Sequence, residues 1–130
     1  MGRAAMIESL FSDSNYAAAK QLLDATVVRH EALAANLANI ETPGYKRVDL
    51  PKEFEQEFAA RLRGGEVARA TTPVPIADPS AVTQRKDGNN VELDHELLAL
   101  SRNSLQFDTL TEFVSGSIKA LRLAITGRTA

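Results

Sequence analysis

Small and apolar residues recur at alternating spacings of three and four along the first third of the chain. The positions in this stripe are Tyr16, Ala19, Leu23, Thr26, His30, Leu33, Leu37 and Ile40. This alternation places them all on one face of a helix and is typical of a coiled-coil seam. The pattern therefore predicts one long helix over about residues 13–40.

A second stripe with the same alternation occupies the last third of the chain. Its positions are Leu93, Leu97, Leu100, Ser104, Phe107, Thr111, Val114, Ile118, Leu121 and Ile125. We expect a second long helix that is capped at its start by Asn90 or Asp94 and is ended by Gly127. Gly116 inside this helix costs about 1 kcal/mol relative to alanine, which suggests that another element packs closely there.

The segment between the stripes, residues 41–89, contains all five prolines, so no helix crosses it whole. Phe54, Phe58 and Leu62 lie at i, i+4 and i+8 and predict a short amphipathic helix from Pro51 to about Arg63. The rest is expected to be extended chain and turns. The fold class is therefore mainly α, with long N- and C-terminal helices paired as a coiled coil around an irregular middle. We expect residues 1–46 and 84–130 to form one helical domain, with 47–83 as a connecting segment or outer flap.

The first helix is expected to end in the stretch "NLANIETPGYK", in which two asparagines precede a proline and a glycine that terminate the helix. Thr42–Tyr45 suits a type II turn, because Pro43 fixes its own φ and Gly44 tolerates a positive one. Asn36 and Asn39 lie on one flank beside the seam. They either face water or, if buried, need polar partners.

The overall composition excludes several classes of function. Lys and Arg number 15 against 17 Asp and Glu, so there is no basic surface for nucleic acid. Cysteine is absent, which excludes disulfides and thiolate sites. Neither a signal peptide nor a transmembrane segment is expected, and composition alone would place the chain in the cytoplasm.

Candidate chemistry is sparse, and we expect no catalytic, cofactor or metal site. His30 lies on the first stripe, where a structural role is the ordinary one. Asp94–Glu96 are consecutive, cannot converge on one metal from a helix, and suit a solvated helix start. Lys46 and Arg47 could meet acidic groups or lipid head groups, but a solvated loop is the default interpretation.

The segment "ANLANIETPGYK", Ala35 to Lys46, resembles the N-terminal signature of the flagellar rod and hook axial proteins. The later segments "RKDGNNVELDHEL" and "NSLQFDTLTEFVSGSIKALRLAI" are similar to proximal-rod members of the flagellar basal-body rod protein family. In that family the terminal helices pair as an inner, rod-core domain. The resemblance covers both long helices and hardly constrains residues 51–83.

The resemblance implies a structural subunit of the proximal rod without enzymatic activity or cofactor. Such a subunit polymerises through its terminal helices, links the export-gate and membrane-ring base to the distal rod, and transmits torque. Implied partners are other copies of the chain, the rod proteins FlgC and FlgF, the basal adaptor FliE and the flagellar export gate. The implied location is the periplasmic rod, reached by type III export without a cleaved signal peptide, which replaces the cytoplasmic interpretation.

Two sets of residues are expected to carry this role. The helix-pairing seam comprises Leu23, His30, Leu33, Leu37, Ile40, Leu97, Leu100, Phe107, Val114, Ile118, Leu121 and Ile125. The expected subunit contact at the family motif comprises Asn36, Asn39, Thr42, Pro43, Gly44 and Tyr45.

Two other classes of function remain open. A coiled-coil adaptor or regulatory binding protein would be stable and oligomeric alone, whereas a rod subunit would stay labile until it meets its partners. A small helical enzyme would need a converging polar cluster, which the spacing does not provide.

Overall fold

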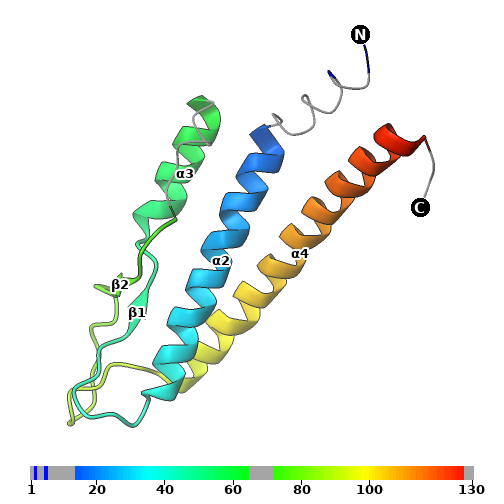
Figure 1. Cartoon of the computed structure of the whole chain (residues 1–130). Helices are drawn as coiled ribbons and strands as arrows, with labels where there is room; N and C mark the ends of the chain where they lie inside the picture. Colours follow the sequence, from blue (N-terminus) through cyan, green and yellow to red (C-terminus); the bar gives the residue numbers. More distant parts are fainter. Residues whose placement is uncertain (1, 3–4, 6–13, 65–71, 128–130) are drawn as a thin grey trace.

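The computed structural model describes residues 2, 5, 14–64 and 72–127. Two long helices, α2 (Ser14–Ala38) and α4 (Leu93–Thr126), enclose a middle with strand β1 (Val48–Asp49), helix α3 (Glu53–Gly64) and strand β2 (Ile76–Ala77). Helix α2 lies between α3 on one side and α4 on the other (Figure 1). The predicted fold class is confirmed: the chain is mainly helical, its two long helices pack together, and its middle is short and irregular. The expected start of the first helix at residue 13 lies outside the described residues.

Helix α2 is the central element, and small residues make up most of its buried surface. Apart from Asn36, the buried side chains form two adjacent rows at heptad spacing, Ala18, Ala25 and Ala32 in one and Ala19, Thr26 and Leu33 in the other. Because alanine and threonine project little from the helix, neighbouring elements can approach α2 closely on two flanks. The broad buried face lets α2 support α3 and the strands as well as α4.

Helix α3 packs on the first half of α2 through its aromatic residues. Phe58 is buried against Ala18, and Phe54 contributes a partly buried ring whose centroid is 5.9 Å from that of Phe58. Acidic residues in its first turn and arginines in its last turn complement the helix dipole. The predicted short amphipathic helix is thus confirmed.

The two short strands pair antiparallel, with Val48 opposite Ala77 and Asp49 opposite Ile76. They lie along the flank of α2 that α3 also occupies (Figure 1). The pairing joins segments that are far apart in the sequence. It brings residues 47–49 next to residues 76–78, which positions the polar site.

The start of α4 differs from the expectation. Its N-cap residue is Glu92, which makes no side-chain capping hydrogen bond, instead of Asn90 or Asp94. The Asn90 side chain is used elsewhere, because its Oδ1 accepts a hydrogen bond of 2.6 Å from the Arg47 backbone N–H. Gly127 ends the helix as predicted, with φ of 66° and its N–H bonded to the Leu123 carbonyl.

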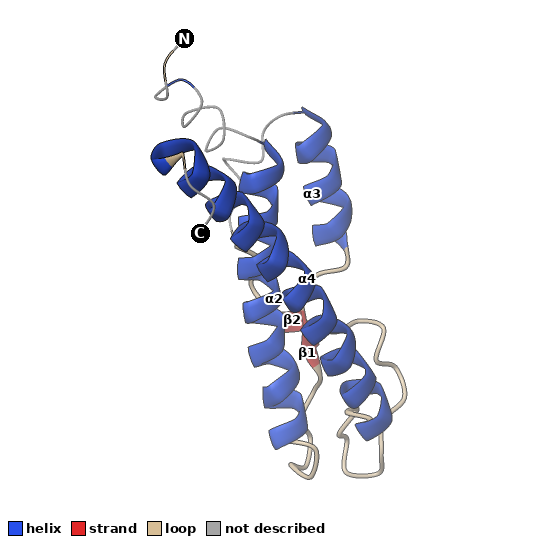
Figure 2. Ribbon diagram, turned by 90° about the vertical axis from the view of Figure 1, so that its right-hand side faces the viewer, coloured by secondary structure: helices blue, strands red, loops and turns tan. Residues whose placement is uncertain are grey.

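Helix α4 carries exposed apolar side chains along its whole length. The axes of α2 and α4 spread apart towards the C-terminal end of α4 (Figure 1), and Figure 2 shows the same two helices after a quarter turn. A Cβ added to Gly116 would meet no atom within 4 Å, so within this chain nothing packs closely there. The exposed large apolar residues of α4 are Leu93, Leu97, Leu98, Leu105, Phe107, Phe113, Ile118, Leu123 and Ile125.

Candidate functional site

A tight turn follows α2 and starts the polar site. The Tyr45 N–H donates to the Thr42 carbonyl at 3.2 Å, and Gly44 has φ of 74°. These features confirm the predicted turn, since a positive φ at the third position favours glycine. The turn returns the chain along α2, so that residues 45–49 lie beside the end of that helix.

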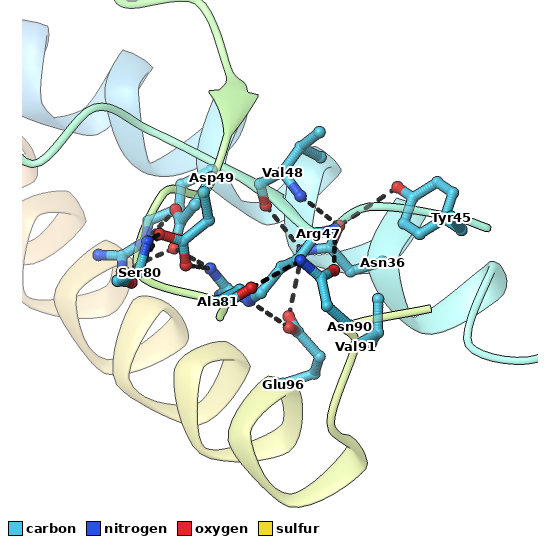
Figure 3. A network of polar contacts seen from close by, with 12 residues as sticks. Asn36, Tyr45, Arg47, Val48, Asp49, Ser80, Ala81, Asn90, Val91 and Glu96 are labelled. Carbon is cyan, nitrogen blue, oxygen red and sulfur yellow. Dashed lines mark hydrogen bonds and ion pairs between the residues drawn. The ribbon is translucent and has the colours of Figure 1, made fainter. Parts of the chain in front are cut away.

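Asn36 is completely buried and uses both ends of its side-chain amide. Its Nδ2 donates to the Val48 carbonyl at 2.7 Å and to Glu96 Oε2 at 3.2 Å. Its Oδ1 accepts from the Val48 N–H at 2.9 Å and from the Tyr45 hydroxyl at 3.2 Å (Figure 3). An asparagine with all of these partners satisfies the backbone of β1 in the way a neighbouring strand would.

The expected role of Asn36 as a subunit contact is therefore corrected. Its side chain has no exposed surface and bonds to its own chain. Asn39 is different, because it is half-buried and makes only local bonds, from its Nδ2 to the Ala35 carbonyl and to its Oδ1 from the Thr42 hydroxyl.

Arg47 and Glu96 form a buried ion pair at the centre of the site. Arg47 is 2% exposed and Glu96 is fully buried, and the Arg47 Nε donates to Glu96 Oε1. The same guanidinium bonds through Nη1 to Asp49 Oδ2 at 3.0 Å (Figure 3) and to Asp78 Oδ2 at 2.7 Å. The expected solvated positions of Arg47 and Glu96 are wrong, because β1 places the guanidinium between α4 and the β2 end. The nearby exposed residues Asp94 and His95 do face solvent as expected.

The ion pair sits in a group we call the Arg47 cluster, namely Arg29, Arg47, Asp49, Asp78 and Glu96. Arg29 completes it by donating from Nε to Asp49 Oδ1 at 3.1 Å. Two guanidinium groups thus form ion pairs with three carboxylates, so that each buried charge has a partner of opposite sign. The cluster links α2, the two strand segments and α4.

The cluster also shifts pKa values. Burial alone lowers the pKa of Arg47, but its hydrogen bond to Glu96 and the charges of Glu96 and Asp49 outweigh burial, so the pKa is raised. Burial alone raises the pKa of Asp78, but hydrogen bonds from Ser80 and the contact with Arg47 outweigh it, and the pKa is lowered. Burial and the charge of Glu96 raise the pKa of the Tyr45 hydroxyl. The charged forms of Arg47 and Asp78 are therefore stabilised in the folded chain.

The segment before α4 caps the end of α2. The Asn89 side chain is buried and donates from Nδ2 to the carbonyls of Asn39, Ile40 and Thr42 at 3.0, 3.0 and 2.9 Å. Arg85 adds a bond from Nη2 to the Ile40 carbonyl. Carbonyls at a helix C-terminus lack partners within the helix, so these side chains supply them. Residues 85–90, which the sequence predicts to form only a turn, thus bind the end of α2. We call Asn89 and Arg85 with these hydrogen bonds the Asn89 clamp.

A further buried asparagine, Asn103, lies near the middle of the contact between α2 and α4. It is 2% exposed, and its Nδ2 donates to the Thr26 carbonyl at 2.8 Å. The side-chain oxygen, Oδ1, has no hydrogen-bond partner among the described residues. The spacing of apolar positions does not single out Asn103.

The structure places the seam residues unevenly. Leu33 is buried, and the half-buried members are Leu23, Leu37, Ile40, Leu100, Val114 and Leu121. The exposed members are His30, Leu97, Phe107, Ile118 and Ile125. The least exposed positions of α4 keep Leu100, Val114 and Leu121 of the predicted stripe and shift most of its other positions by one residue. The shifted positions are Glu96, Asn103, Leu110, Ser117 and Ala124, and Ala99 is also half-buried.

The motif residues after Asn39 lie at the surface. Thr42, Pro43 and Gly44 are exposed, and Tyr45 is half-buried. The Tyr45 hydroxyl donates to Asn36, which also bonds to Glu96 of the Arg47 cluster.

The chemistry available to the site is structural. Every carboxylate of the Arg47 cluster contacts an arginine, which leaves it poorly placed to move protons. In residues 14–64 and 72–127, no group of three His, Asp or Glu side chains could hold a metal ion. No helix in these same ranges is long and apolar enough to cross a membrane.

The chain is similar in sequence to curated proteins from several bacteria, and the three that follow carry the same name. The chain is 31% identical to "Flagellar basal body rod protein FlgB" of Escherichia coli (strain K12), over 78% of this chain and 86% of that protein. It is 30% identical to the protein of the same name from Aquifex aeolicus (strain VF5), over 84% and 90% of the two chains. The Bacillus subtilis (strain 168) protein of that name is 27% identical, over 77% and 84%. No family model matches the chain.

Proposed function

The chain belongs to the FlgB family of flagellar basal body rod proteins, and on that premise we propose that it polymerises through its long helices. It is a structural subunit of the proximal rod of the bacterial flagellum. The similarity extends over most of this chain and most of each relative, so the family assignment does not depend on one short motif.

The observation that carries the proposed assembly is the exposed apolar surface of α4. Leu98, Leu105 and Leu123 lie off the predicted seam and are 51%, 69% and 43% exposed. Ile118 and Ile125, within the seam, are 42% and 48% exposed. Large apolar patches on a single chain are typical of surfaces that another protein covers. Neighbouring subunits related by a helical operator would bury them through heterologous contacts that propagate a rod.

The arrangement of the domains supports an inner and an outer part. We propose that residues 1–46 and 84–130 form the rod core and that residues 47–83 form an outer flap. In Figure 1, α3 and the strands lie on the opposite side of α2 from the C-terminal part of α4, and the strand segments reach α4 only near its start, through Arg47 and Glu96. The apolar surface of α4 is therefore left open for neighbouring subunits.

A stiff subunit suits the role of linking the export-gate and membrane-ring base to the distal rod and transmitting torque. The Arg47 cluster and the Asn89 clamp join α2 to α4 at the turn end with directional bonds. Such bonds resist sliding of one helix along the other. We propose that this end transmits load while the free length of α4 binds neighbours.

The proposed partners follow from the family. They are other copies of the chain, the rod proteins FlgC and FlgF, the adaptor FliE and the export gate. The proposed location is the periplasmic part of the rod, reached through the flagellar export channel. The exposed residues of the turn, Thr42, Pro43 and Gly44, together with the half-buried Asn39 and Tyr45, stay our proposed subunit contact at the family motif. We propose no catalytic activity.

Deletion of the gene in its host tests the proposed function. The expected result is loss of motility and absence of hooks and rods from purified basal bodies, with both restored by the wild-type gene. A regulatory adaptor would instead leave rods that are normal in composition but altered in number. Normal flagella in the deletion strain would contradict a structural role.

A further inference from the structure

A groove runs between α2 and α4 on the surface of the helix pair. Its hollow measures about 390 Å³. The lining residues are Thr26, Val27, His30 and Glu31 on α2, and Asn103, Ser104, Phe107 and Asp108 on α4. We call it the α2–α4 groove. It does not overlap the Arg47 cluster.

One of the lining residues, Asn103, carries a buried hydrogen-bond acceptor, and the same residue also lines a second hollow together with Arg29 and Asp49. The Asn103 Nδ2 is held by the Thr26 carbonyl at 2.8 Å, which identifies the other end of the amide as the oxygen. That oxygen, Oδ1, is buried and has no hydrogen-bond partner in the described part of the chain. A buried acceptor without a donor is unfavourable, so a ligand that donates an N–H or O–H here gains more than it would at an exposed site.

The remaining lining residues define the chemistry of such a ligand. Val27 and Phe107 are apolar and are 43% and 38% exposed. Glu31 and Asp108 place one exposed carboxylate on each helix. No lysine or arginine is among the lining residues, and His30 is the only other ionisable group there. The groove therefore combines an apolar wall, a buried acceptor and a negative rim.

We propose that the α2–α4 groove receives a basic side chain, lysine or arginine, from a neighbouring rod subunit. The alkyl stem packs on Val27 and Phe107, where the aromatic ring also attracts a cation. The N–H groups donate to Asn103 Oδ1, and the positive charge lies between Glu31 and Asp108. This inference rests on the proposed polymerisation and names one contact within it.

A protein side chain fits this groove better than other ligands. The two carboxylates disfavour phosphates, nucleic acid and other anions. On α4, Leu97 and Leu105 are exposed apolar residues that precede lining residues by about two turns and one turn of helix, and the assembled rod is proposed to bury them. A basic side chain on a neighbouring helix would reach the groove while that helix covers the apolar residues.

Charge reversal of the rim tests the proposal. The variant Glu31→Lys with Asp108→Lys is compared with Asp24→Lys with Glu112→Lys, which makes the same change of net charge at exposed positions of the same helices outside the groove. Both variants are expressed in the deletion strain, and the protein is quantified in culture supernatant and in purified basal bodies. Because a like charge opposes the incoming cation, groove reversal is expected to lower incorporation by about tenfold or more. The control variant should incorporate almost as well as wild type, and both should be exported.

Equal incorporation of the two variants would overturn the proposal. If the deletion strain builds normal rods, the proposed function itself fails. If the deletion removes rods but groove reversal leaves them intact, only the inference about the groove fails.

The identity of the incoming side chain is tested by crosslinking in assembled rods. Phe107→p-benzoylphenylalanine is incorporated, purified basal bodies are irradiated, and the crosslinked peptide is mapped. The expected product joins the groove to a helix of another rod subunit, next to a lysine or arginine. Changing that basic residue to glutamate in the strain carrying Glu31→Lys with Asp108→Lys is then expected to restore incorporation. Crosslinks only within the chain, or a charge swap that restores nothing, would overturn the assignment.

Discussion

Asn36 connects three segments through a single side chain. It belongs to α2, and its amide bonds to Val48 in β1, to Glu96 in α4 and to the Tyr45 hydroxyl after the turn. Because the amide oxygen and nitrogen both have partners, its removal would leave the Val48 N–H and carbonyl, which are half-buried, without these hydrogen bonds. The first asparagine of the motif thus holds the fold together.

We expect Asn36→Ala to lower the free energy of unfolding of the chain by about 2 to 4 kcal/mol. The measurement is urea unfolding followed by circular dichroism. Asn39→Ala is the matched control, because its partly exposed bonds are local and its loss should cost less than about 1 kcal/mol. Similar losses for the two variants would contradict the central role of Asn36.

Asp78 makes stability depend on pH. Its pKa in the folded chain lies below its ordinary value of 3.8 because bonds from Ser80 and Arg47 outweigh burial. A depressed folded pKa stabilises the fold above the ordinary value, and the stabilisation is lost as pH falls through the folded pKa. The ion pair with Arg47 is therefore present at neutral pH and lost in acid.

The corresponding prediction compares Asp78→Asn with wild type from pH 7 down to strongly acidic solution. We expect the variant to be less stable at neutral pH, and the difference to shrink once the pH passes below the ordinary pKa. Thermal unfolding at each pH measures this. Asp24→Asn, at an exposed position, is the control, and its difference in stability from wild type should not shrink as the pH falls. A difference that stays constant into acid would contradict the assignment.

At the scale of elements, periodicity predicts the helices and leaves out the polar site. The stripes of α2 and α4 and the amphipathic pattern of α3 are local, so spacing alone identifies them. A charged residue near a turn or at the start of a helix is ordinarily exposed to solvent. The sequence therefore predicts that Arg47 and Glu96 are solvated. Their burial depends on the pairing of residues 48–49 with 76–77, a long-range contact that no local pattern indicates.

The shifted stripe on α4 has a related cause. Spacing selects the apolar positions, while the face that contacts α2 in the single chain includes Glu96 and Asn103. These polar residues bond to Arg47 and to the Thr26 carbonyl, partners that the sequence does not place. The sequence does hold one signal of their burial: Glu96 and Asn103 are polar residues that recur at helical spacing among half-buried apolar residues. The leucines and phenylalanines left outside form the surface that we assign to assembly.

Replacing Gly116 by alanine tests both the stability of α4 and its packing in the rod. Within the chain, a Cβ there meets nothing, so Gly116→Ala should stabilise the free helix by up to about 1 kcal/mol through helix propensity. If a neighbouring subunit packs closely at this position, the same variant should incorporate less well into rods. We expect both effects, measured by circular dichroism of the purified chain and by quantifying basal bodies.

Gly116→Ser separates propensity from close packing, because serine adds bulk with a smaller gain in helix propensity. Its incorporation should fall at least as far as that of Gly116→Ala, while its helix content rises less. Full incorporation of both variants would show that no close approach occurs at Gly116.

At the scale of the whole molecule, the two ends of the helix pair differ. Polar hydrogen bonds and ion pairs join α2 to α4 at the turn end, whereas the other end exposes apolar side chains. The Arg47 cluster and the Asn89 clamp lie at the turn end, where the chain pairs most of its own buried polar groups and leaves Arg47 Nη2 without a partner among the described residues. Towards the C-terminal end of α4, the helices spread and Phe113, Ile118 and Ile125 remain exposed. Burial of that surface in the polymer would supply hydrophobic free energy that the free chain lacks. Assembly is thus expected to complete the packing of the molecule.

Ile118→Asp tests this view of the whole molecule. The side chain is 42% exposed in the single chain, so the substitution should change the stability of the free subunit little and leave its export intact. In the rod, a buried carboxylate would replace a buried isoleucine, and incorporation is expected to fall by about tenfold or more. Ile118→Leu is the control, because it keeps the apolar volume and should assemble like wild type. Quantifying the subunit in supernatant and in purified basal bodies separates export from assembly, and unimpaired incorporation of Ile118→Asp would place this face of α4 outside the rod contacts.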